Sequence, residues 1–212
     1  KETGHQFAGA LGMRRPNISD VIYSKDDLPL QSGTVIKPAN GAGGRGVYLI
    51  HTENYIVDMK RSKRLESIEK LRKSMQIDLD TNWVSVDEWV FEELIYEKQE
   101  EKIPGRDLKF YCFYGKVPLV LEIIRYPEIR YCWWTGEGEQ IITGKYNDQL
   151  FNGEGFTKNQ LEMVQKISRE IPAPFSRIDY IKSESDLVFG EFTAKPGNYD
   201  EFDEATDQWL GD

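Results

Sequence analysis

The sequence has few of the residues on which secreted disulfide-rich proteins and zinc proteins depend. It contains 2 Cys and 2 His among 212 residues, too few for a disulfide framework and unsuited to a typical zinc site. No apolar run approaches the roughly 20 residues of a membrane span. No stretch has the pattern of a signal peptide. These absences predict a cytoplasmic protein with free thiols and no membrane insertion.

The balance of charge excludes another class of partner. The chain has 36 Asp and Glu against 27 Lys and Arg, which gives a formal net charge of −9. A surface of that sign is unsuited to nucleic acid or to anionic lipid. The hydrophobic content of 39% is that of an ordinary globular protein. A chain of this length can bury a core either as one large domain or as two small lobes.

The stretch TVIKPANGAGGRGVYLI, residues 34–50, carries the clearest chemical signal. Its two apolar ends predict neighbouring strands, and Lys37 ends the first of them. Glycines let backbone N–H groups approach an anion closely, and Lys37 adds a point charge. The predicted polyphosphate-binding residues are Lys37, Gly41, Gly43, Gly44, Arg45 and Gly46. The order of a Walker A loop is absent, and the loop taken alone is equally typical of a hairpin tip without a ligand.

Two carboxylates near the other end of the chain favour the phosphate interpretation. Asp179 and Glu191 lie on strand-like segments joined by residues 182–186, so a hairpin can bring them together. Two hard oxygen ligands beside a phosphate-holding loop suit a Mg²⁺–nucleotide site. The sequence therefore predicts Asp179 and Glu191 as metal ligands. The alternative is that both are ordinary salt-bridge partners of Arg177 or Lys195.

The remaining patterns predict alternating strands and helices. Amphipathic spacing predicts helices over residues 1–11 and 60–78, and the capping box Thr157-Lys158-Asn159-Gln160 opens another that runs to about Glu170. Strand-like segments cover residues 83–95 and 108–124, the second with a turn at 114–116. Residues 96–103 are expected to form a solvated loop. The acidic tail is expected to be a packed cap anchored by Trp209 and Leu210.

Three groups of motifs, taken in order, resemble the ATP-grasp superfamily. They are VIKPANGAGGRGV, then FEELI with PGRDLKF, and then RIDY with GEFTAKPG. Within the superfamily the chain looks most like the TupA-like branch, named for teichuronopeptide synthesis, in which DLKFYCFYGK-, RIDY- and GEFT-like patterns recur. The match covers nearly the whole chain. Each motif is weak alone, and the ordered set is fairly specific.

The resemblance implies an α/β (α+β) fold in which two lobes with antiparallel sheets clamp the nucleotide. Residues 1–95 would form the N-terminal ATP-grasp lobe with the phosphate-binding hairpin. Residues 96–212 would form the C-terminal lobe with the metal-binding carboxylates. The domain that precedes these lobes in the superfamily would be missing or very short.

The resemblance also implies roles for residues outside the two motifs described first. Lys1 matches a nucleotide-contacting lysine, although a solvated terminal lysine is an equally good interpretation. The backbone of Glu92, Glu93, Leu94 and Ile95 would pair with the adenine edge. Asp107 would hold the ribose hydroxyls, where glutamate is commoner in the superfamily. Lys109 lies two residues further along the same strand and can face the same cleft, unless it is only an edge-strand charge.

Together these residues predict an ADP-forming ligase that uses ATP and Mg²⁺. Lys37 and the glycine amides would cradle the β- and γ-phosphates, and Arg177 would stabilise charge on the transferring phosphoryl group. In the resembled enzymes a carboxylate attacks the γ-phosphate, and the resulting acyl-phosphate takes an amine to form a carbon–nitrogen bond. The partners would be a small-molecule or glycan carboxylate and an amine donor, in cell-envelope polysaccharide or related conjugate biosynthesis.

Three points stay open from the sequence. Many ATP-grasp enzymes carry Glu-x-Asn at the metal, whereas this chain has Glu191-Phe192-Thr193, which leaves one or two metal ions as alternatives. A kinase-type phosphotransferase would use the same ATP residues with a hydroxyl acceptor. A non-catalytic nucleotide-binding partner of a sugar transferase would keep Lys37 and show no turnover.

Overall fold

The computed structural model describes residues 2–41, 44–197 and 199–211. The chain divides into two compact units, of which the smaller is Pro16–Ile95 and the larger joins the residues before it to the chain from Tyr96 onward. The first 15 residues were expected in the N-terminal lobe. The structure groups them with the larger unit, because helix α1 (Glu2–Ala10) packs on strand β13. Phe7 lies against Phe192 there, with ring centroids 5.8 Å apart.

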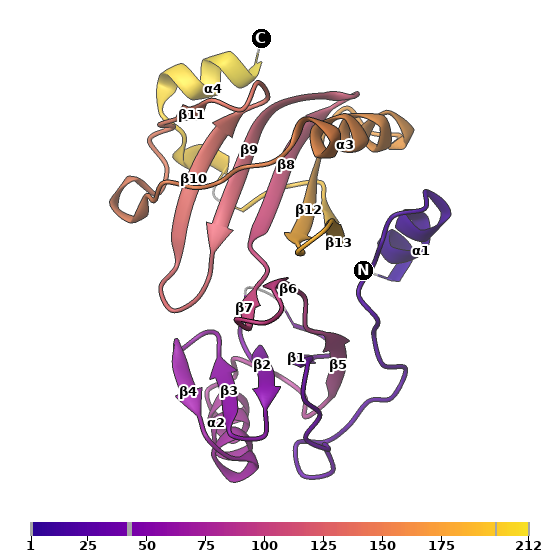
Figure 1. The fold of residues 1–212 in the computed structure, drawn as a ribbon, viewed down its shortest axis with the longest axis vertical. Helices are drawn as coiled ribbons and strands as arrows, with labels where there is room; N and C mark the ends of the chain where they lie inside the picture. Colours follow the sequence, from indigo (N-terminus) through magenta and orange to yellow (C-terminus); the bar gives the residue numbers. More distant parts are fainter. Residues whose placement is uncertain (1, 42–43, 198, 212) are drawn as a thin grey trace. The chain divides into compact units, whose positions relative to one another are not determined.

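The smaller unit is an antiparallel sheet with one long helix. Its strand order is β4-β3-β2-β1-β5, and helix α2 (Ile68–Asp80) follows the sheet's edge strand in the chain (Figure 1). The strands are β1 (Thr34–Pro38), β2 (Tyr48–Thr52), β3 (Tyr55–Asp58), β4 (Lys63–Leu65) and β5 (Trp89–Glu93). Fully buried Ile36, Tyr48 and Trp89 form its core with Leu71 and Met75 of the helix.

Two predicted boundaries in the smaller unit are corrected. Helix α2 begins at Ile68 and not at residue 60, because Ser67 is its N-cap and its hydroxyl accepts a hydrogen bond from Lys70 N. Leu65, which the helical spacing included, lies on β4 and enters the core from the sheet. The strand predicted over 83–95 is limited to β5, and Trp83 before it is 36% exposed.

The larger unit is a six-stranded antiparallel sheet in the order β11-β10-β9-β8-β12-β13. Its strands are β8 (Asp107–Phe113), β9 (Lys116–Ile124), β10 (Arg130–Thr135), β11 (Gln140–Ile141), β12 (Ser176–Lys182) and β13 (Leu187–Thr193). Residues 96–103, expected as a loop, instead begin a small two-stranded sheet of β6 (Tyr96–Lys98) and β7 (Ile103–Pro104). The mixed fold with antiparallel sheets confirms the predicted fold class.

Successive side chains along each strand point to opposite faces, so the larger sheet has two different faces. Leu108, Phe110 and Ile178 point to an apolar core, and helix α3 (Lys158–Glu170) adds Val164 and Ile167 to it (Figure 1). The predicted capping box at Thr157 and Gln160 is confirmed at the start of α3. The opposite face carries Asp107 and Lys109 of β8, Arg177 and Asp179 of β12 and Glu191 of β13.

The end of the chain covers part of that second face. The 3-10 turn η2 (Tyr199–Glu201) leads into helix α4 (Glu204–Gly211), and Phe202 and Leu210 pack against Tyr111 and Trp133 of the sheet. A short 3-10 turn, η1 (Asn147–Gln149), precedes α3. The predicted packed cap is therefore present, although Leu210 is the anchor and Trp209 is 42% exposed.

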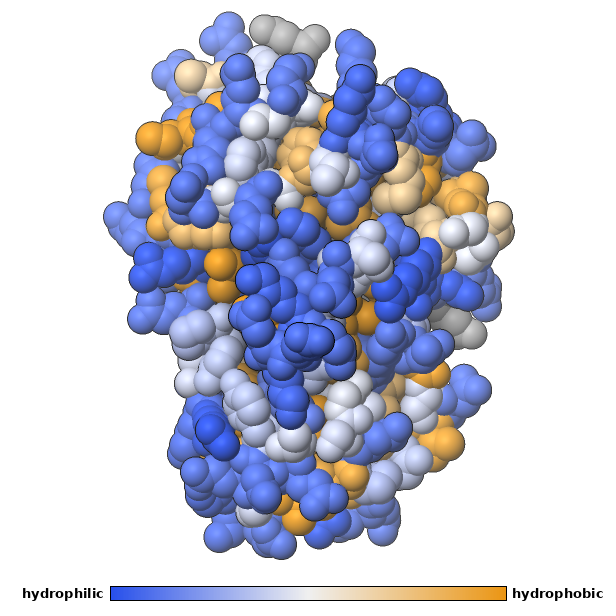
Figure 2. Space-filling model, in the orientation of Figure 1, coloured by the Kyte–Doolittle hydropathy of each residue, from blue (hydrophilic) through white to orange (hydrophobic). Residues whose placement is uncertain are grey.

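The surface agrees with the composition. Hydrophilic side chains dominate the face in view in Figure 2, with apolar residues in smaller patches between them. Among the described residues, no helix is both long and apolar enough to cross a membrane.

Candidate functional site

The glycine-rich segment joins β1 and β2 as predicted. The two strands pair antiparallel, with Thr34 opposite Ile50 and Ile36 opposite Tyr48. Gly44 and Gly46 have φ values of 74° and 70°, where residues with a Cβ are strained. A Cβ on Gly46 would also lie 2.7 Å from side-chain carbons of Pro38 and Val84. The turn thus has a backbone and a packing reason for glycine at position 46, besides any role in binding.

The structure describes most of the predicted phosphate-binding residues. Gly41, Gly44, Arg45 and Gly46 lie in the connection between the two strands, and Arg45 is exposed. Gly43, and likewise the predicted contact Lys1, lie outside the described residues. The role of these residues in binding a phosphate stays a prediction.

Lys37 and Glu92 form an ion pair that the sequence did not predict. Glu92 on β5 lies opposite Val35 of β1, and Val35 and Lys37 point to the same face because they are two residues apart. The side chain of Lys37 is 31% exposed and that of Glu92 is 12% exposed. The carboxylate therefore holds the Lys37 ammonium in place and balances its charge while leaving part of it open to solvent.

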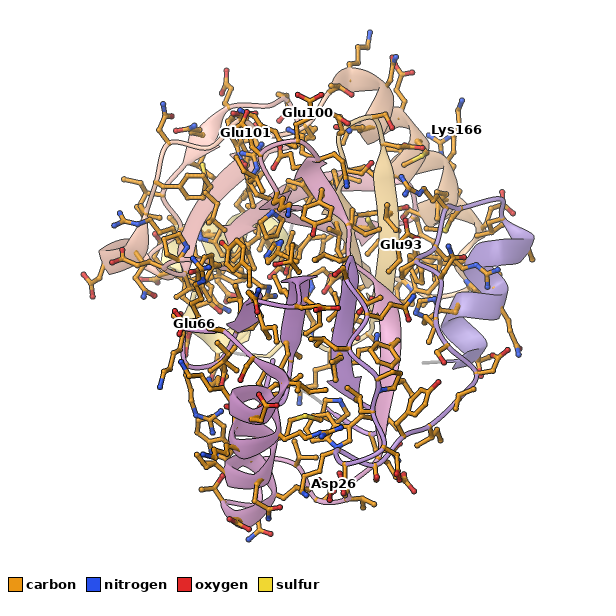
Figure 3. The ribbon with its side chains drawn as sticks, turned by 60° about the horizontal axis from the view of Figure 1, so that its bottom comes forward. Asp26, Glu66, Glu93, Glu100, Glu101 and Lys166 are labelled. Carbon is orange, nitrogen blue, oxygen red and sulfur yellow. The ribbon has the colours of Figure 1, made fainter. Side chains whose placement is uncertain are left out.

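The end of β5 is anchored through backbone groups. Glu93 N donates to Asn17 O at 2.8 Å, and Leu94 N donates to Gly33 O at 3.0 Å. The Glu93 carboxylate (labelled in Figure 3) accepts from Asn17 N at 3.2 Å. Leu94 and Ile95 are buried. Two amides of the segment Glu92 to Ile95 are thus engaged, so pairing with an adenine edge, which stays a prediction, would use other backbone groups of the segment.

In the larger unit, three charged residues form a row across neighbouring strands. Glu191 on β13 lies opposite Asp179 on β12, and Asp179 lies opposite Lys109 on β8. Directly opposed residues point to the same face of a sheet, so the row places both predicted metal ligands side by side. Asp179 is 5% exposed.

Asp179 is the electrostatic centre of this row. Its Oδ1 accepts from Arg177 Nε at 2.7 Å, and its Oδ2 accepts from Arg177 Nη2 at 2.8 Å. Lys109 Nζ donates to the same Oδ2. Arg177 also donates to Thr193 Oγ1 at 3.3 Å. A bidentate arginine together with a second cation gives Asp179 a strong, charge-assisted set of hydrogen-bond partners.

A β-bulge lies at the candidate metal ligands. Asp179 pairs with Glu191, whereas the next residue, Tyr180, pairs with Phe189, which leaves Gly190 as the extra residue of β13. A Cβ on Gly190 would lie 3.2 Å from the Asp179 carbonyl oxygen. Bulges bend a strand and re-aim the side chains beside them. The bulge thus turns β13 at the residue, Glu191, that the metal hypothesis uses.

Asp107 is paired with cations on the same face. Arg125 Nε donates to its carboxylate at 2.9 Å, and Lys109 Nζ lies 3.9 Å away. Burial opposes ionisation of this carboxyl, but the charges of Arg125 and Lys109 outweigh it, so the pKa of Asp107 lies below its usual value. The predicted contact of Asp107 with a ribose would have to share the carboxylate with Arg125, and it stays a prediction.

The lowered pKa of Asp107 makes part of the stability acid-sensitive. The ionised carboxylate stabilises the fold above the unfolded-state pKa, and this contribution is lost as the pH falls through the lower folded-state pKa. We expect Asp107→Asn to lose less stability than the wild type between pH 7 and pH 3. The difference should be at most about 1 kcal/mol, because the Arg125 side chain is 42% exposed. Urea unfolding at both pH values measures it.

The exposed turn residue Glu137 supplies the control for this measurement. Glu137→Gln should keep the acid dependence of the wild type. If Asp107→Asn also loses as much stability as the wild type between pH 7 and pH 3, the Asp107–Arg125 pair contributes nothing to stability.

Sequence reasoning missed Lys145. This lysine is 3% exposed, its Nζ donates to Gly197 O at 3.3 Å, and it lies 5.1 Å from the centroid of the Phe202 ring. Burial lowers the pKa of Lys145 and the charge of Arg177 adds to this, while the carboxylates of Glu201 and Asp200 partly oppose the shift. A buried ammonium in the field of Arg177 is a candidate for binding an anion. No local pattern distinguishes it, because its burial comes from the packing of the chain's end over the sheet.

Asp179 and Glu191 fit a Mg²⁺ ion that takes most of its ligands from phosphate oxygens and water. Within the part of the chain that the structure describes, no group of three or more His, Cys, Asp and Glu side chains could hold a metal ion by itself. Mg²⁺ is commonly held by one or two carboxylates, with phosphate oxygens and waters completing the octahedron. Asp179 and Glu191 satisfy that description, and both are oxygen donors, which Mg²⁺ prefers.

The glycine-rich connection of β1 and β2 and the charged row of the larger sheet lie at the motifs that carried the resemblance to the ATP-grasp superfamily. Comparison with protein families agrees with this class, since the model of the TupA-like ATP-grasp family matches residues 2–212. The chain therefore belongs to the TupA-like ATP-grasp family. A sequence search among curated proteins finds no match.

A solved D-alanine–D-alanine ligase shares the fold. The enzyme from Bacillus anthracis aligns over 100% of this chain and 61% of its own length, with 14% identity and a TM-score of 0.51. The same enzyme complexed with ATP gives 14% identity, 100% and 60% coverage and a TM-score of 0.51. The enzyme from Helicobacter pylori gives 15% identity, 97% and 58% coverage and a TM-score of 0.48. The chain thus spans about three-fifths of the length of these ligases.

Proposed function

We propose that this protein is an ATP- and Mg²⁺-dependent ligase that joins a carboxylate to an amine through an acyl-phosphate. The observation that carries the proposal is the row of Glu191, Asp179 and Lys109 beside Arg177 on one face of the larger sheet. The row combines two oxygen ligands for a metal with two cations for phosphate, in a chain that belongs to an ATP-grasp family. The ligase fold shared with the Bacillus anthracis enzyme, which was also solved with ATP, supports the nucleotide.

Each unit, taken by itself, has residues for which we propose a nucleotide contact. The smaller unit would supply Lys37 and the turn glycines for the phosphates, and the segment from Glu92 to Ile95 for the base. The larger unit would supply Asp107 for the ribose, and Lys109 and Arg177 for the phosphates. Lys145 adds a third cation, since it is buried in the field of Arg177.

Asp179 would exchange partners when the metal–nucleotide complex binds. In the structure, Arg177 and Lys109 donate hydrogen bonds to its oxygens. A Mg²⁺ ion held by Asp179 and Glu191 would neutralise phosphate charge. Arg177 and Lys109 would then be able to donate to phosphate oxygens in place of Asp179. The ion pairs would therefore hold both cations in position before the nucleotide arrives, which reduces the reorganisation needed during reaction.

The proposed reaction balances without a protein nucleophile. A carboxylate oxygen of the first substrate bonds to the γ-phosphorus, and the bond from that phosphorus to the β,γ-bridging oxygen breaks to release ADP. The amine nitrogen of the second substrate then bonds to the acyl carbon, inorganic phosphate leaves, and the amine loses a proton. Arg177 would stabilise the charge on the transferring group, as phosphoryl transfer depends mainly on position and charge neutralisation. We place this reaction in cell-envelope polysaccharide or related conjugate biosynthesis, as the family's name suggests.

A hydroxylamine-trapping assay tests the proposed reaction. The protein is incubated with ATP, Mg²⁺ and a panel of carboxylates, and ADP and the hydroxamate formed from an acyl-phosphate are both measured. The ligase predicts that ADP and hydroxamate appear together, and only with a suitable carboxylate. ADP without hydroxamate in the presence of a hydroxyl acceptor would indicate a kinase-type phosphotransferase. Nucleotide binding without any ADP across the panel would indicate a non-catalytic nucleotide-binding protein.

A further inference from the structure

A cavity of about 290 Å³ opens on the same sheet face as the charged row. It lies entirely within the larger unit and is lined by Tyr111, Phe113, Phe175, Ala194, Lys195, Pro196, Phe202, Asp207 and Leu210. Four of these residues are aromatic, and the lining is mostly apolar. The cavity is partly open to solvent.

The register of the sheet fixes where the cavity lies relative to the charged row. Arg177 is opposite Tyr111 on one side and Thr193 on the other, so these three residues form the next row after Glu191, Asp179 and Lys109. Phe113 and Phe175 lie two residues further along their segments. Rows on one face are two residues, or about 7 Å, apart. Arg177 therefore stands between the charged row and the cavity.

The size of the cavity limits what it can hold. Sites for drug-sized ligands run from about 300 Å³ upward, and an apolar cavity of roughly 150 Å³ takes a benzene molecule. A space of 290 Å³ suits one aromatic side chain with its attached atoms. It is small for an oligosaccharide, and its apolar lining would leave the hydroxyls of a uronic acid without partners.

The geometry points to a carboxylate substrate that carries an aromatic ring, of the size and class of phenylalanine. The ring would occupy the cavity against Tyr111, Phe175 and Phe202. The carboxylate, a few ångströms from the ring in such a molecule, would lie at Arg177, where it meets the transferring phosphoryl group. This inference rests on the proposed function, and it assigns the glycan-derived part of the conjugate to the amine substrate.

The rim of the cavity has charges that fit an amino acid of this class. Lys195 and the exposed Asp207 of helix α4 are both among the lining residues. An α-ammonium group near Asp207 would add an ion pair. L-Phenylalanine should therefore bind more tightly than 3-phenylpropionate, which lacks the ammonium group.

Titration calorimetry on the full chain tests the assignment, with L-phenylalanine, 3-phenylpropionate, L-glutamate and D-glucuronate as probes in the presence of a non-hydrolysable ATP analogue. We expect L-phenylalanine to bind best and the two polar acids to bind at least tenfold more weakly, since an apolar site does not satisfy their polar groups. Equal or tighter binding of glutamate or glucuronate would overturn the assignment. Absence of binding by both ring-bearing probes would also overturn it.

A pair of variants separates filling of the cavity from general damage. Ala194→Leu adds bulk at a residue that lines the cavity, whereas Ala205→Leu adds the same bulk at an exposed position of α4 outside the lining. L-Phenylalanine binding should fall about tenfold or more in Ala194→Leu and stay unchanged in Ala205→Leu. Binding of the ATP analogue should stay unchanged in both.

Binding of the ATP analogue, measured alongside L-phenylalanine binding, distinguishes failure of the cavity assignment from failure of the ligase proposal. Retained binding of the ATP analogue with unaltered L-phenylalanine binding in Ala194→Leu would exclude the cavity as the substrate site and leave the ligase proposal intact. If L-phenylalanine binds and Ala194→Leu weakens that binding, but the ATP analogue does not bind, the ligase proposal is contradicted. The cavity would then remain a binding site.

Discussion

Glu191→Gln should abolish Mg²⁺-dependent turnover while leaving the fold almost as stable as the wild type. The substitution keeps the shape of the side chain and removes the charge that would hold the metal. Within the described residues no ion pair of Glu191 is recorded, so stability should change by no more than about 0.5 kcal/mol. ADP release should fall by a factor of about 100 or more, the size of loss seen when one preorganised electrostatic contact is removed.

Asp179→Asn should lose turnover as strongly but should also lose stability. The carboxamide still accepts a hydrogen bond from Arg177, but the negative charge shared by Arg177 and Lys109 is gone. The side chains of both cations are only 12% exposed, so the loss should be about 1–3 kcal/mol. Urea unfolding and ADP release measured on both variants compare the two positions. If both variants release ADP at the wild-type rate, neither carboxylate serves a metal.

Lys37→Ala should weaken binding of a non-hydrolysable ATP analogue by roughly 10- to 150-fold. That range corresponds to the loss of one charge-assisted contact of about 1.5–3 kcal/mol. The ion pair adds a second effect, because Glu92 would face the phosphates without its cation. Calorimetric titration measures the affinity, and Lys60→Ala at an exposed position of the same unit serves as the control.

A double-mutant cycle separates the lost contact of Lys37 with the phosphates from the repulsion by Glu92. If Glu92 repels the phosphates once Lys37 is gone, Lys37→Ala with Glu92→Gln should bind the analogue more tightly than Lys37→Ala alone. Wild-type affinity in the Lys37→Ala variant, with the fold intact, would remove Lys37 from the nucleotide site.

The sequence was sufficient to predict the fold class and the family, whereas the roles of the site residues stay predictions. The order of VIKPANGAGGRGV, RIDY and GEFT predicted a fold and family that the comparison with known proteins confirms. The hairpin around Lys37 and the helix opened by Thr157 also formed where predicted, because glycine turns and capping boxes are encoded within a few residues.

Features that depend on pairing between distant strands were not predicted. Leu65 continued a helical stripe by spacing alone, and only the sheet shows that it belongs to β4. The pair of Lys37 with Glu92 depends on the register of β1 against β5. The burial of Lys145 depends on how the chain's end covers the larger sheet. Such contacts are set by tertiary packing, which overrides local pattern.

The central claim is that the charged row of the larger unit holds a divalent metal together with a nucleotide. Electron paramagnetic resonance of Mn²⁺, titrated into the protein with a non-hydrolysable ATP analogue, measures this directly. The ATP analogue alone binds some Mn²⁺ and lowers the free Mn²⁺ signal. We expect wild type and the control Glu137→Gln to lower that signal further when the analogue is present. Glu191→Gln should cause no further loss. An equal loss of signal in wild type and Glu191→Gln would contradict it.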